Sequence, residues 1–174
     1  TRELIYAVND TQETAGLITE GFIRKNCDKL KNARMIVTDA NLNEDALNAI
    51  ITIANSNSVP VFADAVSAVK ADRLSNLKGM TDLLSVNRAE FSRLFGDDMF
   101  TGEEIVSGAK KIAHKFGVII RKKDKDGIDL IITESGKSES FTAPDAEVAE
   151  PNGAGDAFNA GFIHSYLTGT HEEQ

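Results

Sequence analysis

The sequence predicts an α/β fold in which a doubly wound sheet is followed by an antiparallel hairpin. Short runs rich in Val and Ile recur along the chain, segments with apolar residues three and four positions apart lie between them, and two further runs near the end flank a polar turn. The runs suit strands buried on both faces of a parallel sheet, and the spaced segments suit amphipathic helices. Strands that alternate with helices indicate a doubly wound sheet.

The expected elements follow one another along the chain. Strands are expected at Leu4–Val8, Ala33–Thr38, Val59–Ala63, Leu83–Val86 and Val118–Ile120. Helices are expected at Thr19–Leu30, Glu44–Ala54, Arg88–Phe95 and Gly102–Phe116. Ile128–Thr133 and Ser138–Thr142 flank a polar turn and predict the hairpin. A last helix should follow Gly153, and because no repeat or low-complexity tract divides the chain, we expect a single domain over residues 1–174.

Length, composition and charge argue against several classes of protein. A chain of 174 residues that is 41% hydrophobic can bury a sizeable core. The formal charge of −8 and the scattered basic residues argue against nucleic-acid binding, which needs clustered positive charge. No apolar run approaches the roughly 20 residues that span a bilayer, and the N-terminus lacks a signal-peptide pattern. We therefore expect a cytoplasmic protein, with the single cysteine, Cys27, half-buried on a helix.

The most informative stretch runs from Asn152 through Gly153, Ala154, Gly155 and Asp156 into the last expected helix. Two glycines allow a tight turn into the helix, and the free N–H groups of the first turn then form an anion site favoured by the helix dipole. An acidic residue in a first turn is also a common way to stabilise a helix. Taken alone, the stretch supports a functional and a purely structural interpretation equally.

The whole stretch resembles the C-terminal signature of the ribokinase-like (PfkB) carbohydrate and nucleoside kinases. The resemblance implies a ribokinase-like fold with a mostly parallel sheet, helices on both of its faces and ATP as cofactor. It also implies that the amides of Gly153, Ala154 and Gly155 hold the transferred phosphoryl group, with Asn152 and Gly155 near the nucleotide. In the family the following Asp, here Asp156, accepts the proton of the acceptor hydroxyl.

A second point of resemblance is the pair Asn87 and Glu90, which matches the family's Asn-x-x-Glu motif between a strand and a helix. The resemblance implies that this pair organises Mg²⁺ and the triphosphate, mostly through water. Mg²⁺ keeps several of its waters and needs few direct carboxylates. The same spacing also fits a helix cap, with Asn87 as the cap and Glu90 completing it.

Polar residues after two of the expected strands indicate a substrate side. Asp39 and Asn41 follow one strand, and Asp64 with its Val-Ser and Lys run follows the next. This pattern resembles the branch of the family that contains the pseudouridine kinases, and loops at the carboxyl ends of parallel strands are where open α/β sheets bind ligands. Asp39 and Asp64 also fit ordinary turns.

Two segments depart from the family pattern. Glu150-Pro151 replaces the usual Asp-Thr, which weakens the case for a monovalent-cation site there. The usual glycine-containing nucleotide loop is replaced by the basic run Arg121–Gly127, in which only Gly127 matches. A basic loop could meet phosphate by charge, or it could be a solvated lead-in to the hairpin.

The resemblance implies transfer of the γ-phosphoryl group of ATP to a hydroxymethyl group of a sugar or nucleoside, with pseudouridine as the preferred acceptor. Ribokinase, fructokinase and adenosine kinase specificities are alternatives, as is a non-catalytic nucleotide-binding module. The family's chains are considerably longer, so we expect the first strands, the lid over the sugar and the end of the nucleotide pocket to be missing. Lids in the family often pair subunits, which implies a homodimer through that lid.

Overall fold

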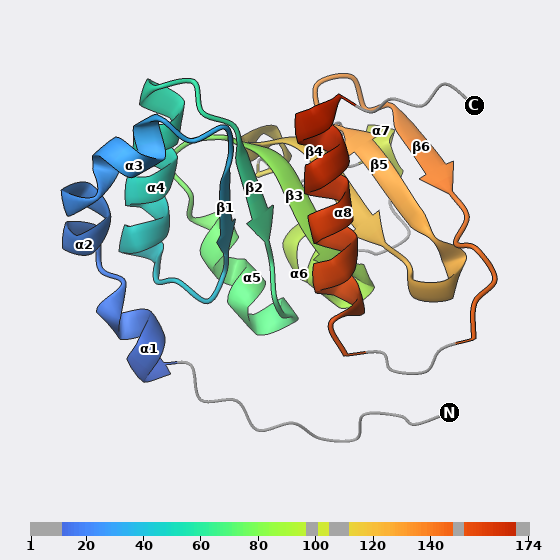
Figure 1. The fold of residues 1–174 in the computed structure, drawn as a ribbon. Coiled ribbons are helices and arrows are strands. Elements are labelled where there is room, and N and C mark those ends of the chain that lie inside the picture. Colours follow the sequence, from blue (N-terminus) through green and yellow to red (C-terminus); the bar gives the residue numbers. More distant parts are fainter. Residues whose placement is uncertain (1–11, 97–100, 105–111, 148–151, 170–174) are drawn as a thin grey trace.

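The computed structural model describes residues 12–96, 101–104, 112–147 and 152–169, which form a six-stranded sheet flanked by helices (Figure 1). The strands are β1 Ile36–Asp39, β2 Val61–Asp64, β3 Thr81–Asn87, β4 Phe116–Lys122, β5 Ile128–Ile132 and β6 Ser138–Phe141, in that order across the sheet. Strands β1 to β4 are parallel to their neighbours. Strands β5 and β6 continue the sheet in antiparallel fashion. The predicted mostly parallel sheet with a C-terminal hairpin is confirmed.

Helices cover both faces of the sheet. They are α1 Gln12–Leu17, α2 Glu20–Lys25, α3 Cys27–Lys31, α4 Glu44–Ser56, α5 Ala68–Ser75, α6 Arg88–Phe95, α7 Gly102–Glu104 and α8 Ala154–Thr168, with short 3₁₀ turns at Ala113–Lys115 (η2) and Asp124–Asp126 (η3). Helices α4, α5 and α6 lie behind the sheet in Figure 1, and α8 crosses in front of it. The two faces therefore have separate apolar cores.

Successive side chains of a strand point to opposite faces of the sheet, so one strand contributes residues to both cores. Leu84 and Ile119 belong to the core under α4, α5 and α6. Their neighbours Leu83 and Ile120 belong to the smaller core under α8, where Phe158 packs against them. Near-continuous apolar strands are thus explained by burial on both faces.

Polar caps fix where the helices begin after three of the parallel strands. Asn43 accepts a hydrogen bond from the backbone N–H of Ala46 at the start of α4. Ser67 does the same at α5, and Asn87 does so at α6. Such caps satisfy N–H groups that have no partner within the helix. Each strand thus leads into its helix by a short, defined turn.

Two expected helices differ from the structure, and one observed helix was not expected. The helix expected at Thr19–Leu30 is divided into α2 and α3 because the Asn26 side chain donates to the carbonyl of Phe22 at 2.9 Å and competes with the helical pattern. The helix expected at Gly102–Phe116 is wrong at its end, because Phe116 pairs with Thr81 in the sheet. Helix α5 was not expected at all.

The strand expected at Leu4–Val8 lies outside the described residues, as does most of 105–111 within the expected helix. Cys27 is half-buried on α3, as predicted. Among the described residues, no helix has both the length and the apolar character needed to cross a bilayer. A cytoplasmic location stays a prediction.

Candidate active site

The last residues of the four parallel strands are all polar and lie at one edge of the sheet. They are Asp39 on β1, Asp64 on β2, Asn87 on β3 and Lys122 on β4. The register places Asp39 beside Asp64 and Asn87 beside Lys122. Three of these four positions were predicted as site residues from the sequence, and the sheet brings them to the same edge as the start of α8 (Figure 1). This is the edge where parallel sheets bind ligands.

The first turn of α8 leaves its backbone amides open. Gly153 precedes the helix in the left-handed conformation with φ of 78°, and no side chain caps the helix start. Its carbonyl accepts from the N–H of Ala157 at 2.9 Å, which is the first helical hydrogen bond. The N–H groups of Ala154, Gly155 and Asp156 consequently have no acceptor within the helix. Together with the helix dipole they form an anion site.

The Asp156 carboxylate is exposed beside these amides. Within the described part of the chain it makes no hydrogen bond or ion pair. It lines a cavity of about 480 Å³ together with Asp39, Asp64 and Asn159. A carboxylate in this position can accept a proton from a molecule that occupies the cavity.

A second cavity, of about 460 Å³, lies on the other side of the same helical turn. Ala154, Gly155 and Phe158 of α8 line it, facing Gly127 and Lys122. Helix α8 separates the two cavities because their lining residues lie on different sides of the helix: 156 and 159 on one side, and 154, 155 and 158 on the other. The open amides thus lie between two cavities with different linings.

A chain of buried and half-buried polar side chains links β3, α8, β2 and β4. The Ser85 hydroxyl donates to Asn159 Oδ1 at 2.8 Å, and Asn159 Nδ2 donates to Asp64 Oδ2 at 2.7 Å. Lys122 Nζ lies 3.3 Å from the same Asp64 oxygen, and the backbone N–H of Val66 donates to Asp64 Oδ1 at 2.7 Å. Ser85 and Asn159 are buried. Hydrogen bonds of this kind hold the ends of the strands and α8 in one arrangement.

Asn87 and Glu90 form the helix cap that their spacing allowed. The Asn87 side chain accepts from the Glu90 N–H at 2.9 Å, and the Glu90 carboxylate accepts from the Asn87 N–H and Nδ2, each at 2.8 Å. Glu90 is only 3% exposed. Burial raises the pKa of Glu90 above its ordinary value, the hydrogen bond from Asn87 opposes this, and the charge of Asp64 adds to the rise.

This geometry fits a water-mediated contact between Glu90 and Mg²⁺ better than a direct bond. Both carboxylate oxygens already accept a hydrogen bond, and each keeps one lone pair for a water. Among the described residues, no group of three His, Cys, Asp or Glu side chains gathers around a metal-sized space. Mg²⁺ in nucleotide sites is often held by phosphates and waters with few protein ligands.

The predicted substrate-side residues Asp39 and Asn41 belong to a braced turn. Asp39 accepts from the Asn41 backbone and side-chain amides, both at 2.9 Å. The side-chain Oδ1 of Asn41 accepts from Lys70 Nζ at 2.5 Å, and Arg73 donates to the backbone carbonyls of this turn. The turn interpretation of Asp39 therefore holds, and its carboxylate still lines the cavity beside Asp156.

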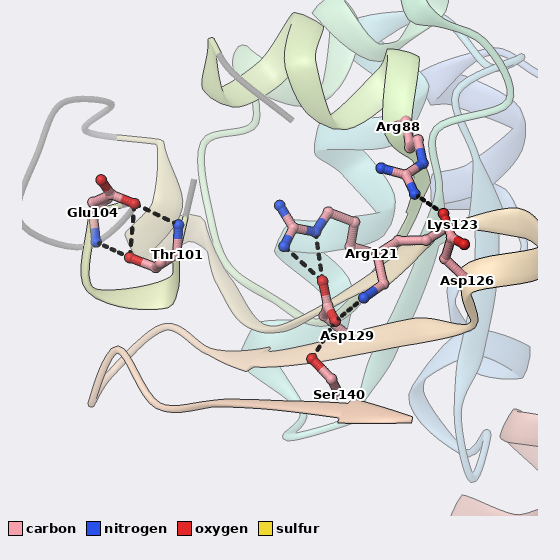
Figure 2. Close-up of polar contacts among 8 residues, drawn as sticks. All are labelled: Arg88, Thr101, Glu104, Arg121, Lys123, Asp126, Asp129 and Ser140. Carbon is pink, nitrogen blue, oxygen red and sulfur yellow. Dashed lines mark hydrogen bonds and ion pairs between the residues drawn. The ribbon is translucent and has the colours of Figure 1, made fainter. Parts of the chain in front are cut away.

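The basic run is only in part a solvated lead-in to the hairpin, because its exposed residues are those of the η3 turn, Asp124–Asp126. Arg121 and Lys122 lie within β4, and Gly127 follows the η3 turn with φ of 87°. Figure 2 shows that Arg121 and Lys123 both point to Asp129 on β5, at 2.6 Å each, with Ser140 of β6 as a further partner. Only 12% of the Arg121 side chain and 19% of the Lys123 side chain are exposed. Two of its cations thus share one carboxylate inside the hairpin.

Three residues of this site were missed from the sequence. Lys122 was grouped with its neighbours, although alternation along a strand predicts that it faces away from Arg121 and Lys123. Asn159 stands three positions after Asp156, a spacing that places both on one side of a helix. Ser85 carries no signal of its own, because a serine within an apolar strand is common.

The structure does not test two features predicted from the sequence. Glu150-Pro151 lies outside the described residues, so the cation site considered there has no structural account. Asn152 is described and exposed directly before the open turn of α8. Its predicted contact with a nucleotide stays a prediction.

Comparisons with known proteins agree with the resemblance found in the sequence. The family model described as pfkB family carbohydrate kinase matches residues 4–174. The chain is 29% identical over 170 residues to a pseudouridine kinase of Escherichia coli (strain K12), covering 97% of this chain and 53% of that protein.

Solved structures share the fold. A carbohydrate kinase from Agrobacterium tumefaciens superposes with a TM-score of 0.73 at 24% identity, covering 95% of this chain and 52% of that chain. Arabidopsis thaliana ribokinase, complexed with ribose and ATP, gives a TM-score of 0.68 at 24% identity, covering 86% of this chain and 48% of that chain. The chain therefore spans about half the length of each of these three relatives.

Proposed function

The chain belongs to the pfkB family of carbohydrate kinases, and we propose that the full-length protein transfers the terminal phosphoryl group of ATP to a hydroxymethyl group of a sugar or nucleoside. Residues 1–174 act in this proposal as one α/β unit that carries the nucleotide side and the catalytic base. Pseudouridine is the preferred acceptor, because the polar residues after β1 and β2 resemble those of the pseudouridine kinases.

One observation carries the proposal: the open first turn of α8 lies between two cavities, with Asp156 facing one and Gly155 the other. Phosphoryl transfer needs donor and acceptor on opposite sides of the moving group, with fixed dipoles at its equatorial oxygens. Amides held by a helix supply those dipoles without rearrangement. The arrangement of amides and carboxylate fits this requirement.

Each cavity takes one substrate in this scheme. ATP occupies the side lined by Gly127 and Gly155, with Asn87 and Asn152 near its phosphates. The acceptor occupies the side of Asp39, Asp64 and Asp156, with Asn41 bracing that turn. The acceptor oxygen attacks the γ-phosphorus, the bond from that phosphorus to the β–γ bridging oxygen breaks, and ADP leaves with the bond electrons.

The proton of the acceptor hydroxyl goes to Asp156 as the new bond forms. The Asp156 carboxylate lies beside the open amides and lines the acceptor-side cavity, where it can accept this proton. Glu90, supported by Asn87, would hold Mg²⁺ through water, and the ion supplies positive charge to the triphosphate when it is bound. A monovalent cation has no assigned residue in this scheme.

Replacement of Asp156 by Asn tests the base. We expect kcat of the full-length protein to fall about 10³-fold, with folding nearly unchanged because the side chain is exposed. Asp28→Asn on exposed α3 is the matched control and should leave kcat unchanged. Turnover of Asp156→Asn within a few-fold of wild type would remove Asp156 from this role.

The acceptor is decided by a kinetic screen of the full-length protein. Pseudouridine, uridine, ribose, fructose and adenosine are compared by kcat/KM with ATP in excess. The highest value with pseudouridine supports the preferred acceptor. A higher value with ribose, fructose or adenosine assigns ribokinase, fructokinase or adenosine kinase specificity instead.

A non-catalytic nucleotide-binding module is the second candidate. The specific observation in its favour is that Arg121 and Lys123, which replace part of the family's nucleotide loop, are paired with Asp129. Such a protein would bind ATP in calorimetry yet transfer no phosphoryl group to any acceptor in the screen. The open amides beside Asp156 favour the kinase.

A further inference from the structure

Three consecutive cations at the end of β4 are divided between the two faces of the sheet. Arg121 and Lys123 turn toward α6 and the hairpin, where Asp129 binds both. Arg121 also lies over the Phe91 ring, with its guanidinium carbon 4.6 Å from the ring centroid. Lys122, between them, turns to the opposite face and reaches the start of α8. Strand alternation therefore sends one cation of the three toward the open amides.

Lys122 is held at that position by a fixed carboxylate. Asp64 accepts from Val66 through Oδ1 and from Asn159 through Oδ2, so its orientation does not depend on the lysine. The Lys122 side chain is 18% exposed, and its Nζ lies 3.3 Å from Asp64 Oδ2. That distance is longer than the roughly 2.7–2.9 Å of a tight charge-assisted hydrogen bond. The ammonium is thus oriented by Asp64 but held loosely.

The free side of this ammonium faces the nucleotide-side cavity. A Cβ added at Gly155 would lie 3.6 Å from Lys122 Nζ, which places the nitrogen against the first turn of α8. Lys122 lines the cavity with Gly127, Ala154 and Gly155. An ammonium has three N–H donors, and the contact with Asp64 uses one of them. Donors remain for phosphate oxygens.

We propose that the Lys122 ammonium binds the terminal phosphate of ATP and stays with that group while it moves to the acceptor. This inference rests on the proposed function and assigns a further substrate-contacting residue within it. Lys122 exchanges no proton: it contributes charge and two N–H donors, while the bond changes at phosphorus and the proton transfer to Asp156 stay as described. Its side chain replaces, by charge, part of the contact that a glycine-containing loop makes through its backbone.

Lys122→Met in the full-length protein tests the inference through the difference between ATP and ADP. Binding of each nucleotide is measured by calorimetry in excess Mg²⁺, and kcat is measured with the best acceptor of the screen. We expect ATP affinity to fall about 10- to 100-fold with little change for ADP, and kcat to fall as well. Lys122→Arg should recover part of both losses.

Two further variants serve as controls for nonspecific loss of charge and for loss of stability. Lys125→Met removes a cation from the exposed η3 turn of the same segment and should leave the ATP-to-ADP affinity ratio unchanged. The double variant Lys122→Met/Asp64→Asn removes the unpaired carboxylate, so it decides the question if the single variant is unstable. Its ATP-to-ADP affinity ratio should fall as in the single variant.

The outcomes separate the two proposals. Equal losses for ATP and ADP, or no loss for either, overturn the role of Lys122 and leave the kinase proposal standing. A wild-type protein that binds ATP but phosphorylates no acceptor overturns the kinase proposal, and a lost preference for ATP in Lys122→Met then still supports the lysine contact. A wild-type protein that binds neither nucleotide overturns both.

Discussion

Replacement of Asp129 by Asn is expected to destabilise the hairpin strongly. The Asp129 side chain is 5% exposed and accepts from Arg121 Nε and a terminal guanidinium nitrogen at 2.9 and 2.6 Å. Lys123 Nζ and the Ser140 hydroxyl each lie 2.6 Å from its other oxygen. One carboxylate therefore joins β4, β5 and β6 (Figure 2). Asn keeps the shape but turns an amide N–H₂ toward a cation.

The size of the effect follows from burial and charge. Removing one partner of a buried ion pair costs about 3–5 kcal/mol. The low end, about 3 kcal/mol, applies here because an Asn oxygen can still accept from one of the partners. For a chain of about 150–250 residues the melting temperature should fall by roughly 6–12 °C, and by less in a longer protein. Urea unfolding of the full-length protein measures the free-energy difference, and thermal unfolding measures the shift.

The stability difference between wild type and Asp129→Asn should depend on pH. Burial alone would raise the pKa of Asp129, but hydrogen bonds from Lys123, Ser140 and Arg121 and the charge of Arg121 hold the pKa below its ordinary value of 3.8. A lowered pKa in the folded state adds stability above the unfolded value, and this stability is lost as the pH falls through the folded value. The advantage of wild type over Asp129→Asn should be constant from about pH 7 to 5 and shrink below about pH 4.

Asp126→Asn is the matched control in the same hairpin. Asp126 pairs with Arg88 at 2.6 Å, but 56% of its side chain is exposed. An exposed pair is worth about 1 kcal/mol or less. If Asp129→Asn proved no less stable than Asp126→Asn, the claim that Asp129 fastens the three strands would be refuted.

Two other substitutions test the turn and the cap. Gly127→Ala should lower the free energy of unfolding in urea by about 3 kcal/mol, because φ is +87° and the new Cβ would lie 1.9 Å from the Phe141 carbonyl oxygen. Gly161→Ala is the control, because open space surrounds Gly161. Equal stability of the two variants would contradict this explanation. Asn87→Ala should cost about 1 kcal/mol while Asn87→Ser keeps the cap. If Asn87 also serves the nucleotide, Asn87→Ser keeps stability but raises the KM for ATP, whereas an unchanged KM leaves only the cap.

Local sequence signals predicted those parts of the fold that local physics decides. Helix α6 begins and ends where expected because Asn87 and Glu90 form its cap and Phe91, Leu94 and Phe95 supply its buried face. Helix α5 was missed because its apolar face is short. It depends on contacts distant in sequence, such as those of Arg73 with the backbone carbonyls of the turn after β1.

The candidate site also has features that the sequence predicted and features that it did not. Asp156 and the open amides were predictable because the two glycines and the acid are adjacent in sequence. The link from Ser85 through Asn159 and Asp64 to Lys122 was not, because it joins four elements whose proximity only the folded sheet creates. The role given to Asn87 and Glu90 stayed open because one spacing serves both a cap and a magnesium site.

The charge at this edge of the sheet bears on the role proposed for Lys122. The chain carries a net charge of −8, and Asp64 and Asp156 both face the space beside the open amides. Burial raises the pKa of Glu90, the charge of Asp64 adds to the rise, and the charge of Lys122 opposes it. A polyphosphate is repelled by such a surface unless positive groups stand close to it, since Coulomb interactions strengthen at short range in a partly buried site. The amides of α8 contribute only partial charges. In the scheme we propose, the Lys122 ammonium, oriented by Asp64, adds a full positive charge beside these amides, together with any metal ion that the nucleotide brings.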